Sequence, residues 1–293
     1  MSTNSNIAIR SAETVSAIRA VACKEKHTAG RCNDHLAKHF LGPKYKLITG
    51  CMPHRLMKAA IEMISPGSYG FIITRTCLFD KTLEEEIRLG IRQLVILGAG
   101  YDSRPFRFAD QLKNIKIFEL DFPGTQLHKR KRLARVVSKV PDNLVFIPID
   151  FNKESFELSL LKRGFNPYVK TLFLWEGVSY YLPESVVKKV FSYVSTCASG
   201  SSIVFDYATK DFVNGDHTSY GGKQLSKWLK KINEPFLFGM NAGESRSFLH
   251  HCGLSLLADY SPADLEKLYL INKYGRDEAK TLGHVRMAHA KNL

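Results

Sequence analysis

From about residue 90 onward, short apolar segments alternate with segments of helical periodicity, and this alternation constrains the fold more than any other feature. The apolar segments carry hydrophobic residues at consecutive positions, which is typical of strands buried on both faces. Such strands separated by helices predict an α/β fold with a mostly parallel sheet covered on both sides. The predicted strands are 92–98, 115–121, 144–150, 171–177 and 201–207, and the predicted helices between them are 123–139, 154–163 and 183–198.

The two ends of the chain are less regular. Helices are predicted at 13–24, 33–40, 53–64 and 82–89, and later at 223–232, 242–251 and 261–267, with strands at 254–260 and 285–290. No Pro/Gly/Ser-rich linker separates these parts, so we expect one integrated unit. Residues 1–89 would form a helical N-terminal cap on a domain of residues 90–293, with a further cap insert near 208–241.

Composition and cysteine usage narrow the class of protein. Hydrophobic residues make up 44% of the 293 residues and charged residues 24%, which is typical of a folded globular chain. No apolar stretch is long enough to span a membrane, and the N-terminus lacks a secretory signal, so we predict a cytoplasmic protein with no membrane partner. The six cysteines contain no CxxC pair, which favours neither a disulfide framework nor a metal site. The six cysteines are Cys23, Cys32, Cys51, Cys77, Cys197 and Cys252.

The formal net charge of +14 comes largely from two basic runs, residues 128–139 and 223–231. Both have helical spacing, and the second offers Leu225, Trp228 and Leu229 for a buried apolar face. We therefore predict two solvated helix faces, with an anion-attracting patch as the alternative. No zinc-finger or RNP-type pattern accompanies them, so nucleic acid is an unlikely partner.

A glycine turn is the sharpest local signal. In LVILGAGYDSR an apolar strand runs into Gly98 and Gly100, which permit a tight turn and a close ligand approach at the carboxyl edge of a parallel sheet. A merely structural turn is the alternative interpretation. Position 103 is Ser where the dinucleotide fingerprint requires Gly, so a pyrophosphate ligand is disfavoured.

Acidic residues follow the glycine turn at the ends of three successive strands. Glu119 and Asp121 end one strand, Asp150 the next and Glu176 the one after. In nucleotide-binding α/β folds an acidic side chain in this region accepts hydrogen bonds from ribose hydroxyls. Acid-rich strand ends therefore suit a ligand with ribose hydroxyls, an amino group and little phosphate, a description that S-adenosylmethionine (SAM) meets.

Four segments extend this pattern into a family resemblance. They are TRTCLFD (74–80), GIRQLVILGAGYDSRPFRF (90–108), FELDFPGTQLHKR (118–130) and FLWEGVSYYL (173–182). In order and interval they resemble the leucine carboxyl methyltransferase family, including its bacterial SAM-dependent branch. The resemblance implies a Rossmann-like class I SAM-dependent methyltransferase sheet of about seven mostly parallel strands with an N-terminal helical cap. Residues 90–293 would then be the SAM-binding methyltransferase domain.

The resemblance also implies roles for residues near the methionine portion of SAM. Arg75 would bind the SAM carboxylate through its guanidinium, or would instead form a surface ion pair with Asp80 or Glu84. The backbone at Gly98 and Gly100 would lie alongside the methionine portion of SAM. Asp102 would fix the glycine loop or cap the segment after it.

Other site residues would meet the rest of the cofactor and the acceptor. Asp121 would hold the ribose hydroxyls, with Glu119 as second choice. Asp150 and the backbone of Phe151 would meet adenine, and Glu176 would accept from the SAM ammonium. Tyr181 would lie between cofactor and acceptor as the candidate catalytic residue, or would be a core tyrosine. A last candidate, Arg19, could reach the cofactor or the acceptor carboxylate.

We therefore predict a SAM-dependent O-methyltransferase. A carboxylate acceptor on a small molecule or a peptide end is favoured, because a carboxylate is ionised at neutral pH and needs no general base. A hydroxyl on a secondary metabolite is the second hypothesis, and a nucleic-acid-associated binding protein that keeps the fold is the third. The N-terminal region lacks the signature of the eukaryotic enzymes that act on a phosphatase, so a phosphatase substrate is not expected. The sequence leaves the oligomeric state open.

Overall fold

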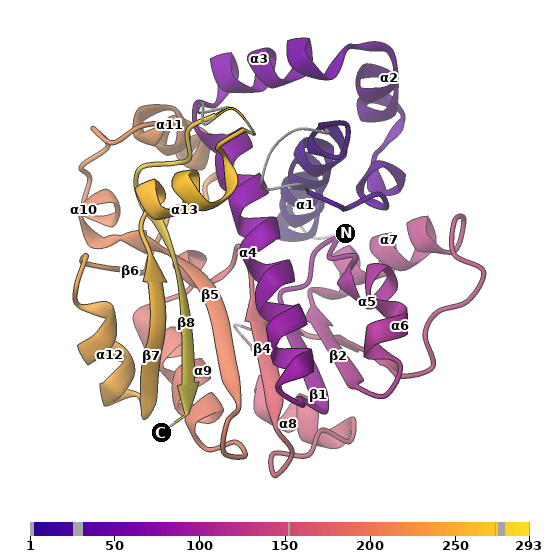
Figure 1. Ribbon diagram of the computed structural model, residues 1–293, viewed down its shortest axis with the longest axis vertical. Helices are drawn as coiled ribbons and strands as arrows, with labels where there is room; N and C mark the ends of the chain where they lie inside the picture. Colours follow the sequence, from indigo (N-terminus) through magenta and orange to yellow (C-terminus); the bar gives the residue numbers. More distant parts are fainter. Residues whose placement is uncertain (1–2, 26–31, 152, 273, 275–278, 293) are drawn as a thin grey trace.

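The computed structural model describes residues 3–25, 32–151, 153–272, 274 and 279–292, and a mixed β-sheet runs through their centre (Figure 1). Within these residues the strand order is β3-β2-β1-β4-β5-β8-β7, and β6 pairs with the end of β5. Strands β1 to β5 run parallel, whereas β8 is antiparallel to both of its neighbours. The strands are β1 Gln93–Leu97, β2 Lys116–Asp121, β3 Leu144–Pro148, β4 Thr171–Trp175, β5 Ser202–Thr209, β6 Gly239–Met240, β7 Leu254–Tyr260 and β8 Val285–Asn292. The predicted α/β fold is confirmed.

The core lies on both faces of this sheet. All five residues of β1 are buried, and they alternate between two apolar clusters. Leu94 and Ile96 belong to the cluster that contains residues of α4, whereas Val95 and Leu97 belong to the one that contains residues of α9. Because side chains alternate along a strand, a continuous apolar run is what a sheet covered on both faces requires.

The helices cover the two faces of the sheet and its upper end in Figure 1. Pro43 and Pro262 lie in the first turns of α2 and α13, where proline suits a helix start. The helices are α1 Thr3–Ala22, α2 Pro43–Cys51, α3 His54–Ile64, α4 Ser68–Arg88, α5 Arg104–Arg107, α6 Ala109–Leu112, α7 Pro123–Leu133, α8 Phe156–Lys162, α9 Glu184–Ser195, α10 Lys210–Val213, α11 Gly222–Ile232, α12 Ser245–His251 and α13 Pro262–Tyr269, with short 3-10 helices η1 Ala37–Phe40 and η2 Ser179–Tyr181.

Three sequence predictions of helices differ from the structure. The helix predicted over 33–40 is only η1, and the one predicted over 82–89 is the end of the longer α4. Tyr69 to Thr76 are all buried, so this part of α4 shows no apolar–polar periodicity that would identify it as a helix. The helix predicted to reach residue 139 ends at Leu133, before the β-branched Val136 and Val137, which have low helix propensity.

The N-terminal helices lie over the carboxyl ends of the parallel strands. Helix α1 contacts α4 and α7, and Ala12 of α1 lies beside Gly100 in the turn after β1. The segment that contains α10 and α11 reaches the same end, where the Tyr220 hydroxyl donates to Glu62 Oε1 of α3 at 2.7 Å. In Figure 1 both α3 and α11 lie at the top of the molecule, and α8 lies at the opposite end. Among the described helices, none has the length and apolarity needed to cross a membrane.

Candidate active site

The glycine turn and the end of β2 meet at this edge of the sheet. Gly98 and Gly100 have φ angles of 66° and 49°, in the left-handed region that favours glycine. The Gly100 N–H donates to Asp121 Oδ2 at 2.5 Å, and the Phe122 N–H donates to Asp121 Oδ1 at 2.6 Å. Asp121 is therefore fixed beside the turn, as a strand-end acid on the same crevice should be.

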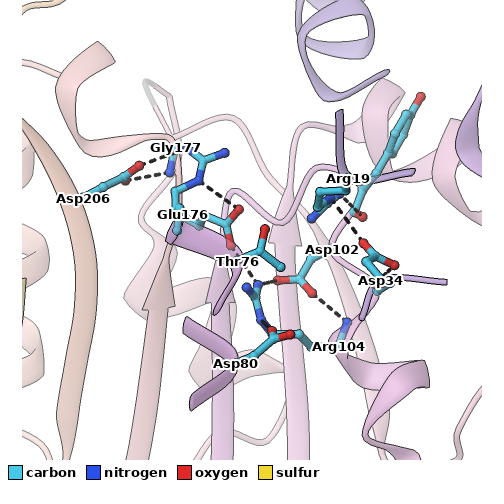
Figure 2. Close-up of polar contacts among 12 residues, drawn as sticks. Arg19, Asp34, Thr76, Asp80, Asp102, Arg104, Glu176, Gly177 and Asp206 are labelled. Atoms are coloured by element: carbon cyan, nitrogen blue, oxygen red, sulfur yellow. Dashed lines mark hydrogen bonds and ion pairs between the residues drawn. The ribbon is translucent and has the colours of Figure 1, made fainter. Parts of the chain in front are cut away.

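A chain of ion pairs continues from this turn toward β5. Arg75 of α4 lies with Nε 3.1 Å from Glu176 Oε1 and with Nη1 3.0 Å from Asp206 Oδ2. Neither contact uses Nη2 of Arg75. Figure 2 shows Asp206 beside Gly177, whose N–H donates to Asp206 Oδ1 at 2.7 Å. Arg75 is thus no surface residue, and in the structure its carboxylate partners differ from the Asp80 or Glu84 of the alternative interpretation.

Arg104 joins three carboxylates at the centre of the same edge, as Figure 2 shows. Its Nε lies 2.7 Å from Asp80, and its Nη1 lies 2.5 Å from Asp102 and 2.8 Å from Glu176. The Arg104 side chain is fully buried, and the Arg104 N–H also donates to Asp102 Oδ1 at 2.7 Å. Asp102 therefore holds both the backbone and the guanidinium of the residue that follows the glycine turn.

Arg19 of α1 closes the other side of the turn. Its Nε lies 3.2 Å from Asp34 Oδ2, and its Nη2 donates to the Tyr101 carbonyl at 2.9 Å. The Ser103 hydroxyl donates to Asp34 Oδ1 at 2.6 Å. The cap is therefore linked to the glycine turn through a buried ion pair.

Burial and the arginines set the protonation of these carboxylates. Burial raises the pKa of Asp102 and of Glu176, but Arg104 together with other nearby cations, Lys129 for Asp102 and Arg75 for Glu176, more than offsets it and lowers both pKa values. For Asp206 the effect of burial on the pKa exceeds the opposing effect of Arg75, so its pKa is raised. Burial also raises the pKa of Asp121 to about 6. Asp102 and Glu176 are consequently ionised at neutral pH.

The remaining predicted residues lie around this network. Glu119 is buried on the same face of β2 as Asp121, because residues two apart on a strand share a face. Its Oε2 lies 2.7 Å from Lys129 Nζ, and burial raises its pKa to about 7. Asp150 follows β3 and lies 3.3 Å from Lys153 Nζ, while Phe151 packs near Phe156. Neither residue takes part in the ion pairs of Arg75 and Arg104 described above.

Tyr181 lies in η2 next to the network but within an aromatic cluster. Its ring centroid is 4.9 Å from that of Tyr180 and 5.1 Å from that of Phe236, and its side chain is partly buried. The Tyr180 hydroxyl accepts from Arg75 Nη1 at 3.5 Å. Burial raises the pKa of Tyr181 above its ordinary value.

Two residues of the network were not assigned a role from the sequence. Asp206 is level with Glu176 because Trp175 of β4 pairs with Phe205 of β5, but Tyr207 and Ala208 follow it within the strand, so the sequence does not mark it as a strand-end acid. Arg104 stands in the DSR motif, but a buried arginine has no periodic signature, and its three carboxylates come from separate parts of the chain. Among the described residues, no group of three or more His, Cys, Asp or Glu side chains could hold a metal ion.

Solved structures share this fold. A DUF574 family protein from Streptomyces avermitilis aligns with 96% of this chain and 97% of its own, with a TM-score of 0.60 and 11% identity. A chain from Thermobifida fusca YX named as a methyltransferase aligns over 82% of this chain and 88% of its own, with a TM-score of 0.55 and 16% identity. These likenesses show the fold, and the glycine turn and strand-end acids at its carboxyl edge place it in the Rossmann-like class of nucleotide-binding α/β folds.

Sequence comparison identifies the family within that class. The leucine carboxyl methyltransferase model matches residues 12–195, and the chain belongs to this family. YktD of Bacillus subtilis (strain 168), named as a SAM-dependent methyltransferase, is 33% identical over 243 residues, which cover 81% of this chain and 77% of YktD. The chain is therefore a SAM-dependent methyltransferase, and the alternative of a binding protein without that activity is set aside.

The chemistry of the donor set fits SAM. Asp121 and Glu176 supply carboxylate acceptors for hydroxyl and ammonium hydrogens, and Arg75 supplies a guanidinium for a carboxylate. A side chain at Gly177, where φ is 74°, would place its Cβ 3.0 Å from Arg75 Nη1, so glycine keeps this side of Arg75 open.

The raised pKa of Asp121 predicts a pH dependence of stability. Its ordinary pKa of 3.8 becomes about 6 in the folded protein, so the folded protein binds this proton more tightly than the unfolded chain. The resulting stability is fully present below about pH 4 and is lost as the pH rises through about 6. Asp121→Asn removes this titration. The unfolding free energy of the variant minus that of the wild type should therefore increase between about pH 4 and about pH 6.

Urea unfolding at a series of pH values measures this difference. Asp142→Asn is the matched control, since the Asp142 side chain is 82% exposed. The control should follow the wild type at every pH. An Asp121→Asn curve that runs parallel to the wild type would contradict the assignment of the titration to Asp121.

Proposed function

We propose that this enzyme is an O-methyltransferase that methylates a carboxylate of a small molecule or a peptide end. The observation that carries the proposal is that the acidic side chains beside the glycine turn are already engaged. Asp102, Glu176 and Asp206 contact arginines, and Asp121 accepts two backbone N–H groups. A carboxylate acceptor is itself ionised at neutral pH, so it needs no base from the protein.

The proposed cofactor contacts follow from complementary charge. The amino-acid end of SAM carries a carboxylate and an ammonium, and the Arg75–Glu176 pair offers the opposite charge to each. Binding would exchange part of this internal ion pair for the cofactor. Asp121 would hold the ribose hydroxyls, and Asp150 with the backbone of Phe151 would meet adenine. Gly98, Gly100 and Asp102 would shape the backbone past which the methionine portion lies.

In the proposed mechanism the protein acts mainly by positioning. Bound SAM supplies an electrophilic methyl group on a sulfonium. The acceptor carboxylate would receive that methyl group on an oxygen, and the bonding pair of the C–S bond would stay with sulfur. The chain's part is to hold the acceptor in line with that bond and to exclude water. Tyr181 would border the acceptor through its ring, since burial keeps its phenol protonated and therefore unsuited to act as a base.

A cationic cavity in the cap supports an anionic acceptor. It has a volume of about 760 Å³ and is bordered by α1, the segment of residues 33–39 and α2. Its lining includes Lys24, Lys38 and Lys46, and also Asp34, whose carboxylate pairs with Arg19. Arg19 in turn donates to the Tyr101 carbonyl, so one ion pair separates the cavity from the glycine turn.

The test is methyl transfer from SAM to a panel of carboxylic acids, followed by treatment of the products with alkali. A carboxyl methyl ester releases methanol in alkali, whereas a methyl ether does not. Alkali-labile products support the proposal. Exclusively alkali-stable products would favour the second hypothesis, a hydroxyl acceptor.

Substitution at Tyr181 separates the two acceptors further. With a carboxylate acceptor, Tyr181→Phe should keep kcat within about threefold of the wild type, because no proton has to be removed. A hydroxyl acceptor that used the phenol as its base should instead lose roughly 100-fold or more. Steady-state kinetics on the best acceptor measures this. Tyr193→Phe, in α9, is the matched control and should not change kcat.

Two predictions from the sequence keep the status of proposals. We propose a cytoplasmic location, to which the absence of disulfide bonds among the described cysteines is suited. We also propose that residues 1–89 act as a cap, and residues 208–241 as an insert, on the methyltransferase domain.

A further inference from the structure

The cap end of the molecule displays large apolar side chains to solvent. Over α2, α3 and the turn between them, six of these side chains are between 39% and 80% exposed, and Met63 is the most exposed of them. They are Leu47, Ile48, Met52, Leu56, Met63 and Ile64. Single exposed apolar residues are ordinary, but six within eighteen positions form a concentration that marks interaction surfaces.

The spacing within α3 separates two faces. Met57 is buried and Ile61 is partly buried, and both pack in the core cluster that contains residues of α4. Leu56 and Met63 are seven positions apart, so they share one helix face, and both are exposed. This helix therefore has a second apolar stripe that the rest of the described chain does not cover.

Helix α11 adds an aromatic residue and positive charge at the same end. The sequence predicted that Trp228 would help form a buried face, but its side chain is 38% exposed, whereas Leu229 is buried. Around Trp228 the lysines of α11 are exposed, and this helix contains no acidic residue. The exposed lysines of α11 are Lys223, Lys227, Lys230 and Lys231. The contact between Tyr220 and Glu62 joins the start of α11 to the end of α3 (Figure 1).

We infer that this cap-end surface, formed by the exposed apolar residues of α2 and α3 together with Trp228 and the lysines of α11, docks on an anionic lipid surface. This revises the sequence prediction of no membrane partner, which rested on the lack of an apolar stretch long enough to span a membrane. Apolar side chains and a tryptophan can enter the acyl boundary while lysines face the negative headgroups. A second copy of the chain would bring like charges together. A nucleic acid would be bound through phosphates and would leave the apolar stripe of α3 without a role.

The inference is independent of the acceptor chemistry. The residues of the cap-end surface are distinct from Arg75, Asp121 and Glu176, which are proposed to bind the cofactor. Docking would place the cap, and the sheet edge beneath it, toward the lipid surface. Substitutions on this surface should therefore change vesicle binding and leave SAM binding unchanged.

The test is co-sedimentation of the full chain with vesicles. Vesicles of phosphatidylcholine mixed with phosphatidylserine should bind at least about tenfold more tightly than vesicles of phosphatidylcholine alone, and salt should weaken the binding. Met63→Asp should lower the affinity by about tenfold or more, and Lys227→Gln with Lys230→Gln by about tenfold. Leu158→Asp and Lys162→Gln on α8, whose side chains are exposed at the opposite end, are the matched controls and should bind as the wild type does.

Trp228 provides a second readout, because the other tryptophan, Trp175, is fully buried in β4. Emission should shift to shorter wavelength when anionic vesicles are added, and Trp228→Phe should abolish that shift. Equal binding to both kinds of vesicle, no binding, or equal loss in the α8 controls would overturn the inference. So would retention on single-stranded RNA together with vesicle binding that is insensitive to Met63→Asp. Calorimetric SAM binding by each variant confirms that the variants fold.

Discussion

Arg104→Met should lower the free energy of unfolding by about 3–5 kcal/mol, one of the two largest effects expected in this protein. The Arg104 guanidinium is fully buried and contacts the carboxylates of Asp80, Asp102 and Glu176. Removing it leaves the buried Asp102 without its guanidinium partner. It also takes one of two arginine partners from Asp80 and from Glu176, which keep Arg107 and Arg75. Chemical unfolding monitored by circular dichroism measures the change.

Two variants make this result specific. Arg135→Met removes an exposed arginine and should change stability by no more than about 0.5 kcal/mol. Adding Glu176→Gln to Arg104→Met removes one of the negative charges that Arg104 contacted and should recover part of the loss. If Arg104→Met were no more destabilising than Arg135→Met, the ion-pair network would have no structural role.

Gly98→Ala should be the second large effect. The φ angle of 66° disfavours any residue with a Cβ by about 1–2 kcal/mol, and that Cβ would lie 2.4 Å from Val178 Cγ2. Relieving the overlap by shifting the turn should cost a further ~1–3 kcal/mol. Since the turn carries the N–H that binds Asp121, affinity for SAM should also fall, by about tenfold or more.

The chain supplies a control for the backbone part of this effect. Gly90 has a φ angle of 84°, but a Cβ there meets no atom within 4 Å, so Gly90→Ala should show the conformational cost alone. Val178→Ala combined with Gly98→Ala should recover the steric part. Equal losses of stability in Gly90→Ala and Gly98→Ala would show that the contact with Val178 is unimportant.

The fold could be predicted where local pattern and burial agree. The strands β1, β2, β4 and β5 are buried on both faces, so each is mostly apolar in sequence. After the first residue the run is unbroken in β1 and β4, whereas the buried Glu119 and Asp206 interrupt it in β2 and β5. Helix α4 shows the opposite case. Its first half is buried on all sides, and its apolar residues include β-branched and aromatic types, so neither periodicity nor propensity marked it as helical. Burial of a helix on all sides depends on the rest of the fold, so a short stretch of the sequence does not show it.

The candidate site likewise contains residues that the sequence could predict and contacts that it could not. Asp121 and Glu176 follow strands, and the parallel order of β2, β1 and β4 brings their carboxyl ends to one edge of the sheet. Apart from Asp102, which is two residues from Arg104, the partners of Arg75 and Arg104 come from elements far apart in the sequence, so pairing them required the folded chain. Trp228 was misplaced because helical spacing identifies an apolar face but does not show whether another element covers it.

The antiparallel strand β8 has a consequence for the order in which the molecule can assemble during synthesis. β8 lies between β5 and β7, so β7 cannot join the sheet until residues 285–292 have emerged from the ribosome. Until then the side of β5 that β8 will occupy is an open edge with unpaired backbone groups. The half of the sheet with β1 to β4 is free to form earlier, whereas the β7 half must wait until residues 285–292 have been synthesised.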